Sequence, residues 1–241
     1  PPPVRVGLSD ILLHVECPYQ FGLRRIAGVQ PAVGDELGFG EGLHELIQRR
    51  LESDSPWTSD DRRRHVEKYV NLPYMSENGE AAARSAIEDR LEVLERLGVF
   101  DLAVESEVDV EVVLDSGIVH GVVDGIQRED DETVLVRDWK SNIHDELVPR
   151  YERQMQFYVY ALRKQGKRVR KADIVDVGAS VRNHKLVVRD IDISDRNINR
   201  LVTTVERSLR NIGEGKFHPN PGPATCAACD MYRLCGKRWK Q

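Results

Sequence analysis

Two carboxylates and a lysine stand in two apolar segments that follow each other in the chain. Asp124 lies in the first segment, and Asp138 and Lys140 lie fourteen and sixteen residues further on, at the end of the second. Carboxylate oxygens bind hard divalent cations such as Mg2+ or Mn2+, which polarise a phosphate ester and lower the pKa of a bound water. A neighbouring lysine can orient that water or stabilise charge that develops on the phosphate. The three residues form the minimum set for metal-dependent phosphodiester cleavage.

The period of a β-strand would bring these side chains together. Asp138 and Lys140 are two residues apart, so they point to the same face of a strand. The acidic turn 128–133 is short enough for a β-hairpin connection, which would place Asp124 beside Asp138. We therefore expect strands over 117–127 and 133–140.

Two further motifs accompany this set. Gly121-x2-Asp124, Asp138-Trp-Lys140 and a later Gln154-x3-Tyr158, in this order, resemble the RecB-like branch of the PD-(D/E)XK nuclease superfamily. In that branch a Gly-x3-His motif supplies another metal ligand, and Gly40 to His44 has that form. A lone histidine beside an apolar helix stripe is otherwise a core or boundary residue, and the motif order favours the ligand. The resemblance extends from about Leu8 to Cys235.

The resemblance implies a function and a set of site residues. We expect a divalent-metal-dependent deoxyribonuclease that acts on single-stranded DNA or DNA ends, and we expect it to be an exonuclease rather than an endonuclease. The catalytic set it implies is Asp124, Asp138, Lys140, Gln154 and Tyr158, with Gln154 near the attacking water or scissile phosphate and Tyr158 near the DNA. The implied ligands of Mg2+ or Mn2+ are His44, Asp124, Asp138 and the carbonyl of Trp139.

The four cysteines form one pattern, with Cys17 near the start and Cys226, Cys229 and Cys235 in the last sixteen residues. Disulfides are disfavoured for a cytosolic chain with a Cys-x2-Cys spacing. Zinc favours the same thiolates, but its usual structural pattern is two Cys-x2-Cys pairs. The set suits a [4Fe–4S] cluster and resembles the iron–sulfur subset of the family, which includes AddAB-type helicase–nucleases and CRISPR adaptation nucleases. Such a cluster would join the N-terminal helix to the C-terminal tail.

The other elements follow from periodicity and caps. Apolar positions at helical spacing predict helices over about 9–26, with a break at Cys17-Pro18, and over 39–51, 60–69, 80–97, 150–165 and 194–212. Alternating residues predict a long strand from Phe100 to Val112, and apolar runs predict strands at 174–181 and 186–191. The long strand has an acidic face. We interpret Glu105 and Glu107 on it as solvated and leave both outside the site.

Together with the resemblance, these elements predict an α/β fold with a restriction-endonuclease-like core, a central mixed β-sheet flanked by helices. We expect one nuclease domain over 1–241: a mainly helical N-terminal part at 8–98, the catalytic sheet and helix at 99–193, and a C-terminal helix and iron–sulfur cysteine tail at 194–241. A chain of 241 residues is long enough for a substantial core.

Charge and hydropathy restrict the function classes. The net charge of −5 argues against a protein that coats DNA, although metal-site acids contribute to it. Basic clusters at 62–64, 164–171 and 237–240 either contact phosphate or form solvated surface. No apolar run approaches the ~20 residues that span a bilayer, and no signal peptide is present. We expect a cytoplasmic protein without a membrane partner.

Alternative functions stay open from the sequence. The chain could be a catalytically inactive DNA-binding module of a helicase–nuclease complex, although it keeps all the expected ligands. It could also be a stand-alone CRISPR spacer-processing nuclease. The chain has no Gly-x4-Gly-Lys-Ser/Thr loop, so any helicase must be another domain or subunit. The start at Pro-Pro-Pro mildly favours a module of a helicase polypeptide in DNA repair and recombination.

Overall fold

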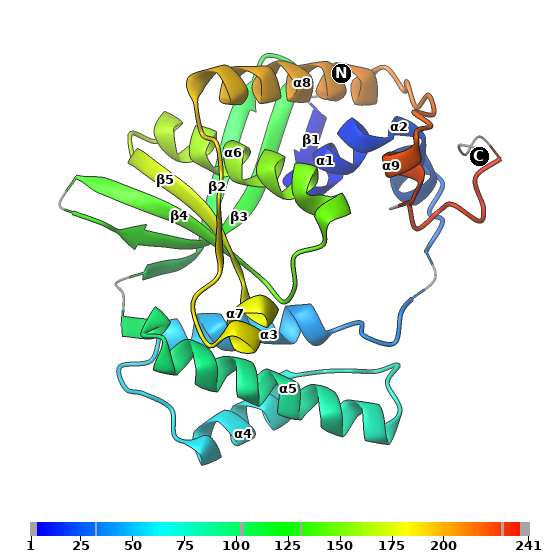
Figure 1. The fold of residues 1–241 in the computed structure, drawn as a ribbon. Helices are drawn as coiled ribbons and strands as arrows, with labels where there is room; N and C mark the ends of the chain where they lie inside the picture. Colours follow the sequence, from blue (N-terminus) through cyan, green and yellow to red (C-terminus); the bar gives the residue numbers. More distant parts are fainter. Residues whose placement is uncertain (1–3, 32, 102–103, 131, 228, 237–241) are drawn as a thin grey trace.

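A mixed β-sheet forms the centre of the molecule (Figure 1). The computed structural model describes residues 4–31, 33–101, 104–130, 132–227 and 229–236. Across these residues the sheet has the order β1-β3-β4-β5-β6, and β2 pairs with β3 on its other side. The strands are β1 Val4–Gly7, β2 Val104–Leu114, β3 Gly117–Arg128, β4 Thr133–Lys140, β5 Arg168–Asp176 and β6 Val188–Asp190.

The sheet is mixed because parallel and antiparallel pairs alternate across it. β1 is parallel to β3 and β4 is parallel to β5, whereas β2–β3, β3–β4 and β5–β6 are antiparallel. β1 and β4 lie along the same edge of β3: β1 pairs with Gly117–His120 and β4 with Gly125–Arg128. The stretch between these two ladders, residues 121–124, therefore lies in a fork of the sheet.

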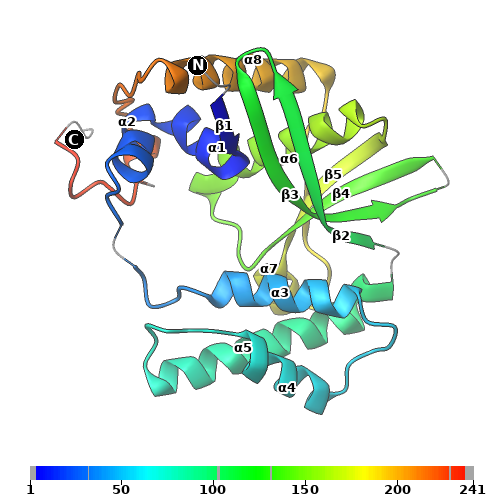
Figure 2. The same ribbon diagram turned by 180° about the vertical axis from the view of Figure 1, so that it is seen from behind.

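Helices pack on the sheet in two groups. The first group is α1 Leu8–Glu16, α6 Val148–Lys164 and α8 Asp195–Gly213, which share one hydrophobic cluster with the sheet. The second is α3 Phe39–Leu51, α4 Ser59–Tyr69 and α5 Glu77–Arg96, at the end of the molecule away from α8 (Figure 2). These three form a second cluster, which also includes Trp139 from β4 and Val175 from β5.

Short elements complete the chain. They are α2 Pro18–Phe21, a π-helical turn Gly22–Ile26, 3-10 turns Val99–Asp101 and Asp145–Leu147, α7 Val177–Asn183 and α9 Pro223–Ala227. No helix within the described ranges is long and apolar enough to cross a membrane.

Most expected elements are confirmed, including the mixed sheet with flanking helices and the break at Cys17-Pro18, where α1 ends and α2 begins. The strand expected at 174–181 is wrong beyond Asp176. The Asp176 carboxylate accepts a hydrogen bond of 2.7 Å from the Ala179 amide and caps α7, so the chain turns into a helix. The next expected strand, 186–191, is reduced to β6 at 188–190, and β1 was not predicted.

Candidate active site

The two central carboxylates face each other at the fork of the sheet. The β3–β4 ladder pairs Gly125 with Arg137 as its last pair on this side. The next residues on the two strands, Asp124 and Asp138, therefore lie opposite each other and point to the same face. Lys140, two residues beyond Asp138, shares that face. The hairpin geometry expected from the sequence is thus present.

A set of close contacts joins this cluster to α3. His44 Nδ1, on α3, lies 3.2 Å from Asp124 Oδ2. The backbone amide of Trp139 donates to the same oxygen at 3.3 Å. Lys140 Nζ lies 2.8 Å from Asp138 Oδ2 and donates to Oδ1 at 3.0 Å. The structure therefore brings the histidine, both carboxylates and the lysine expected from the sequence into one group.

A glycine allows the strands to come together here. An ideal Cβ on Gly125 would lie 2.3 Å from the Trp139 ring, so a side chain at this position would collide with it. The Trp139 ring crosses β3 at this point and packs into the hydrophobic cluster of α3, α4 and α5. This leaves the adjacent Asp138 and Lys140 on the opposite face of β4.

The electrostatics of the two carboxylates differ. Burial raises the pKa of Asp138 to about 6, against the opposing charge of Lys140. Burial also acts to raise the pKa of Asp124, but the hydrogen bond and charge of His44, with Lys140, outweigh it and the pKa is lowered. Burial acts to lower the pKa values of His44 and Lys140, and the neighbouring carboxylates outweigh it so that both are raised. The cluster therefore favours charged His44, Asp124 and Lys140.

Helix α6 covers this group with three polar side chains on one face. Gln154 Nε2 donates to the Tyr158 hydroxyl at 2.9 Å, and burial raises the pKa of Tyr158. The Tyr158 ring also lies against Gly121, where an added Cβ would be 3.2 Å from it. Tyr151, which the sequence analysis did not single out, has its ring centroid 5.4 Å from Lys140 Nζ. It shares the helix face of Gln154 and Tyr158, and that spacing is the signal that could have found it.

One acidic residue of β2 also lies near the group. Glu107 falls between the pairs Ser106–Gly125 and Val108–Val123, across from Asp124, and has the left-handed φ of 51°. Burial and the charge of Asp124 raise the pKa of Glu107, although its side chain is exposed. The sequence interpretation of Glu107 as a solvated residue therefore missed its closeness to Asp124. By contrast, Glu105 forms an exposed ion pair of 2.9 Å with Lys167.

These side chains fit a divalent cation by donor type. Imidazole nitrogen and carboxylate oxygen are ligands for hard and borderline cations. Asp138 Oδ2 is buried and lies 2.8 Å from Lys140 Nζ, but it accepts no hydrogen bond from the described residues, so it has a lone pair to offer a cation. Within the same described residues, no three His, Cys, Asp or Glu side chains are yet arranged to hold a metal ion. Instead, His44 contacts Asp124 and Lys140 contacts Asp138.

The four cysteines come together at the other end of the molecule. Cys17, Cys226, Cys229 and Cys235 line one pocket of about 360 Å3, with Leu23 and Met231 among its apolar walls. Cys17, Cys229 and Cys235 are free thiols. Burial raises the pKa of Cys229 to about 11, and the nearby Cys17 and Cys235 add to this rise. Four thiols from opposite ends of the sequence therefore share one pocket.

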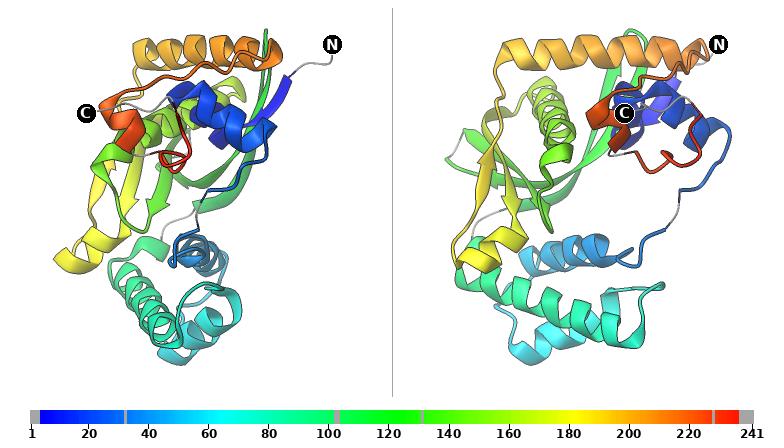
Figure 3. Two further views of the ribbon diagram at one scale, coloured as in Figure 1. Left: turned by 90° about the vertical axis from the view of Figure 1, so that its right-hand side faces the viewer. Right: turned by 45° about the vertical axis from the view of Figure 1, so that its right-hand side comes forward.

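Polar contacts hold the two ends of the chain together around this pocket, where the C-terminal segment lies beside α1 and α2 (Figure 3). Asp230 accepts a hydrogen bond of 2.8 Å from Gln20 and lies 3.1 Å from Arg24. The Asn220 side chain donates to the Glu16 carbonyl at 3.0 Å. The pocket thus belongs to a junction of the N-terminal helices and the C-terminal segment.

Comparisons with known proteins agree with this geometry. A model of the PD-(D/E)XK nuclease superfamily matches residues 8–236. No curated protein matches the sequence. Among solved structures, the fold is similar to that of a protein from Eubacterium rectale named "Putative exonuclease", with a TM-score of 0.59 and 13% identity over 98% of this chain and 89% of that one. SSO0001 is less similar, with a TM-score of 0.46 and 16% identity over 98% of this chain and 87% of that one. The family match covers almost the whole chain, including both carboxylates, the lysine and the cysteine pocket, so this protein belongs to the PD-(D/E)XK nuclease superfamily.

Proposed function

We propose that the chain is a divalent-metal-dependent deoxyribonuclease that hydrolyses phosphodiester bonds at the group around Asp124 and Asp138. The observation that carries the proposal is the buried Asp138, which lies opposite Asp124 and 2.8 Å from Lys140. A buried carboxylate is costly to a fold even beside one lysine, and a bound cation would offset that cost. Membership of a nuclease superfamily supports the same assignment.

The chain's own residues would divide the work. Asp124, Asp138, His44 and the Trp139 carbonyl would hold Mg2+ or Mn2+, which polarises the phosphate and lowers the pKa of a water when bound. Lys140, a buried cation, would stabilise the negative charge that develops on the phosphate. The Gln154 amide oxygen makes no hydrogen bond to any described residue and would accept one from the attacking water. Tyr158, held by Gln154 at 2.9 Å, would line the DNA side of the site.

Digestion of end-labelled single-stranded DNA tests this proposal. We expect the parent to cleave the strand with Mn2+ or Mg2+ and to stop in EDTA. We expect Lys140→Ala to lose cleavage and a matched variant of an exposed, ion-paired lysine, Lys171→Ala, to keep it. Cleavage that persists in Lys140→Ala would refute the assigned centre. A ladder that shortens from one end would support an exonuclease.

We further propose that the cysteine pocket holds a [4Fe–4S] cluster with a structural role. Four thiols in one pocket match the ligand set of such a cluster. The cluster would join α1 and α2 to the C-terminal segment, which already contacts them through Asp230. A brown protein with absorbance near roughly 400 nm is expected, and a colourless protein with stoichiometric zinc would contradict it.

We also propose that the nuclease works with a helicase domain or subunit in DNA repair and recombination. The chain carries no nucleotide-binding loop of the Gly-x4-Gly-Lys-Ser/Thr type, so it cannot supply the unwinding that would deliver a single strand. Helicase motifs in the same reading frame or in a co-purified subunit would support this proposal. A neighbouring integrase gene would favour CRISPR spacer processing instead.

A further inference from the structure

The basic runs of the sequence are largely neutralised in the structure. In the first run, Arg62 lies 3.2 Å from Glu92 and Arg63 lies 3.7 Å from Asp60, and Arg64 pairs with Asp61. In the second run, Lys167, Arg168 and Lys171 each have a carboxylate partner at 2.8–2.9 Å. The third run, 237–240, lies outside the described residues. Six of the eight basic residues described in these two runs are therefore ion-paired, the other two being Lys164 and Arg170.

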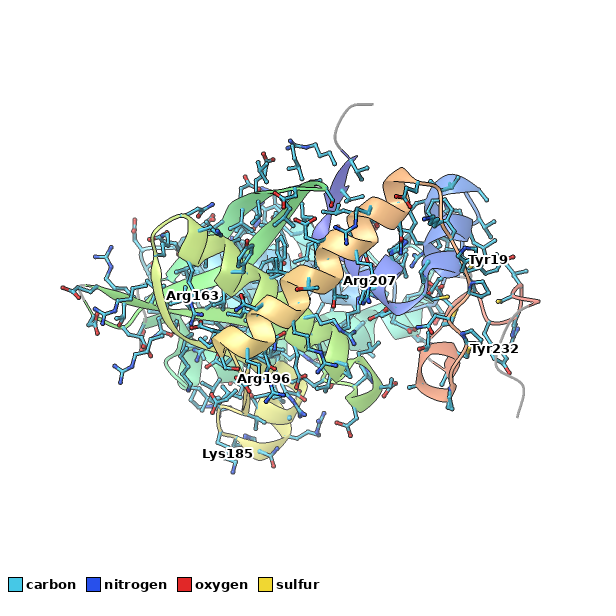
Figure 4. All side chains as sticks on the ribbon, turned by 90° about the horizontal axis from the view of Figure 1, so that it is seen from above. Tyr19, Arg163, Lys185, Arg196, Arg207 and Tyr232 are labelled. Carbon is cyan, nitrogen blue, oxygen red and sulfur yellow. The ribbon has the colours of Figure 1, made fainter. Side chains whose placement is uncertain are left out.

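A different set of arginines has no such partners. The guanidinium groups of Arg153 on α6 and Arg200 and Arg207 on α8 line one groove of about 930 Å3, which is open to solvent. None of the three forms a hydrogen bond or an ion pair with any described residue. Arg200 and Arg207 are exposed and Arg153 is half-buried. Figure 4, seen from above, shows α8 lying across the molecule, with Arg207 further along it than Arg196, another arginine of the same helix.

Helical spacing explains why separate arginines meet there. Arg200, Thr204 and Arg207 are four and three residues apart, so they share one face of α8. Arg153 and Gln156 are three apart on α6 and face the same groove. The walls thus present guanidinium, hydroxyl and amide groups, which are donors for phosphate oxygens. Glu152 also lines the groove, and the charge of Arg153 acts on the nearby Glu16, so three positive charges stand against two negative charges in and beside the groove.

The groove lies next to the candidate active site. Arg153 precedes Gln154 on α6, and successive residues on a helix point about 100° apart. Pro149, in the first turn of α6, lines the groove. Two residues later, Tyr151 faces Lys140 at 5.4 Å. The first turn of α6 therefore lies between the arginine groove and the carboxylates. A DNA strand that passes over this turn would contact both sites.

We propose that this groove binds the phosphate backbone of the DNA strand that is in the active site. The proposal rests on the proposed function and adds to it a track on which the strand is held. The groove lining contains no aromatic residue, whereas protein interfaces are anchored by buried aromatics and base recognition in single strands uses stacking on them. The groove therefore fits a sugar–phosphate backbone, without preference for sequence, better than an acidic protein.

Salt-dependent binding of a labelled single-stranded oligonucleotide in EDTA tests this track without requiring cleavage. The test variant is Arg153→Gln/Arg200→Gln/Arg207→Gln. The matched control is Arg63→Gln/Arg64→Gln/Arg168→Gln, which removes the same charge from ion-paired arginines. Each phosphate contact contributes about 0.7 to the slope of log Kd against log salt for a single strand. We expect the groove variant to lose about 2 of that slope and the control to keep it. A duplex arm shows whether the groove prefers one strand or two.

Several outcomes separate this proposal from the proposed function. Equal slopes of log Kd against log salt for the parent and the groove variant would overturn the proposed phosphate track, even if the parent cleaves DNA. The groove would then be assigned to binding an acidic protein instead. A parent that binds the oligonucleotide but does not cleave it would refute the proposed nuclease function. A smaller salt slope in the groove variant would still support the phosphate track in that case. Because Arg200 and Arg207 are exposed, their double variant keeps the fold and should lose about two thirds of the same slope.

Discussion

Replacement of Asp138 by asparagine should make the metal-free protein more stable. The pKa of Asp138 is raised by burial from 3.8 to about 6. Between these two pH values the unfolded chain releases the proton and the folded chain keeps it. Stability is therefore lost as pH rises through that window, by about 1.4 kcal/mol per pH unit. Over the window of roughly 2 units the loss is about 3 kcal/mol at pH 7, and asparagine, which resembles the protonated acid, avoids it.

Urea unfolding in EDTA measures this effect. We expect Asp138→Asn to exceed the parent by up to about 3 kcal/mol at pH 7. The difference should vanish well below pH 3.8, where the Asp138 carboxyl is protonated in both the folded and the unfolded chain. Added Mn2+ should stabilise the parent, by about 2.7 kcal/mol at one hundred times its dissociation constant, and leave the variant unchanged. A variant less stable than the parent at pH 7 in EDTA, or a difference independent of pH, would refute the reasoning.

A buried aspartate on the neighbouring strand supplies the control. Asp173 accepts two hydrogen bonds of 2.7 Å from Arg137, and both side chains are buried. Asp173→Asn leaves the arginine without its counter-charge and should cost about 3–5 kcal/mol. The two asparagine variants are therefore expected to move stability in opposite directions, which separates a functional carboxylate from a structural one.

Three further variants test other parts of the structure. His14 is buried between the rings of Phe21 and Phe217, and burial lowers its pKa from 6.5. The unfolded chain therefore takes the proton first, and stability falls as pH drops below 6.5. In urea titrations the parent should lose stability relative to His14→Phe over this range, and a pH-independent difference would contradict it. Cys229→Ser should abolish the iron–sulfur absorbance and lower the melting temperature, whereas a parent-like melting curve would refute the structural cluster. Gly125→Ala places a methyl group 2.3 Å from the Trp139 ring and should cost about 1–3 kcal/mol; an unchanged urea midpoint would mean that the ring is free to move.

The β3–β4 hairpin was predictable because the sequence features that specify it are local. Strand period, a short turn and the spacing of Asp138 and Lys140 were enough to place both carboxylates on one face, and the register of β3 and β4 agrees. The implied roles of these residues stay proposals. The contact of His44 with Asp124 was expected from resemblance to a motif, since helix periodicity alone left His44 beside the buried stripe.

Other features depend on tertiary contacts that the sequence does not encode locally. The run from Ile174 to Val181 is mostly apolar and fits either a strand or a helix, and the Asp176 cap favours a helix after that residue. β1 is four residues long and gains its strand conformation from pairing with β3. Glu107 alternates like a solvated residue, and only the register across from Asp124 brings it near the site.

The sequence was least informative about which basic residues are free to bind phosphate. The consecutive basic residues were candidates for a phosphate-binding surface, yet most of the described ones form ion pairs with carboxylates. The arginines without partners are isolated in the sequence and meet only through the packing of α6 against α8. Cys17 and Cys226 are 209 positions apart in the sequence. Sequence separation alone likewise does not tell whether two such residues are close in space.

Cleavage of one end-labelled single strand in Mn2+ by the parent and by Asp138→Asn, with both proteins shown to be folded, tests the central claim most directly. The account predicts that the parent degrades the strand and that the variant is inactive although it is the more stable protein in EDTA. An Asp138→Asn protein that cleaves like the parent would contradict the assignment of the active centre.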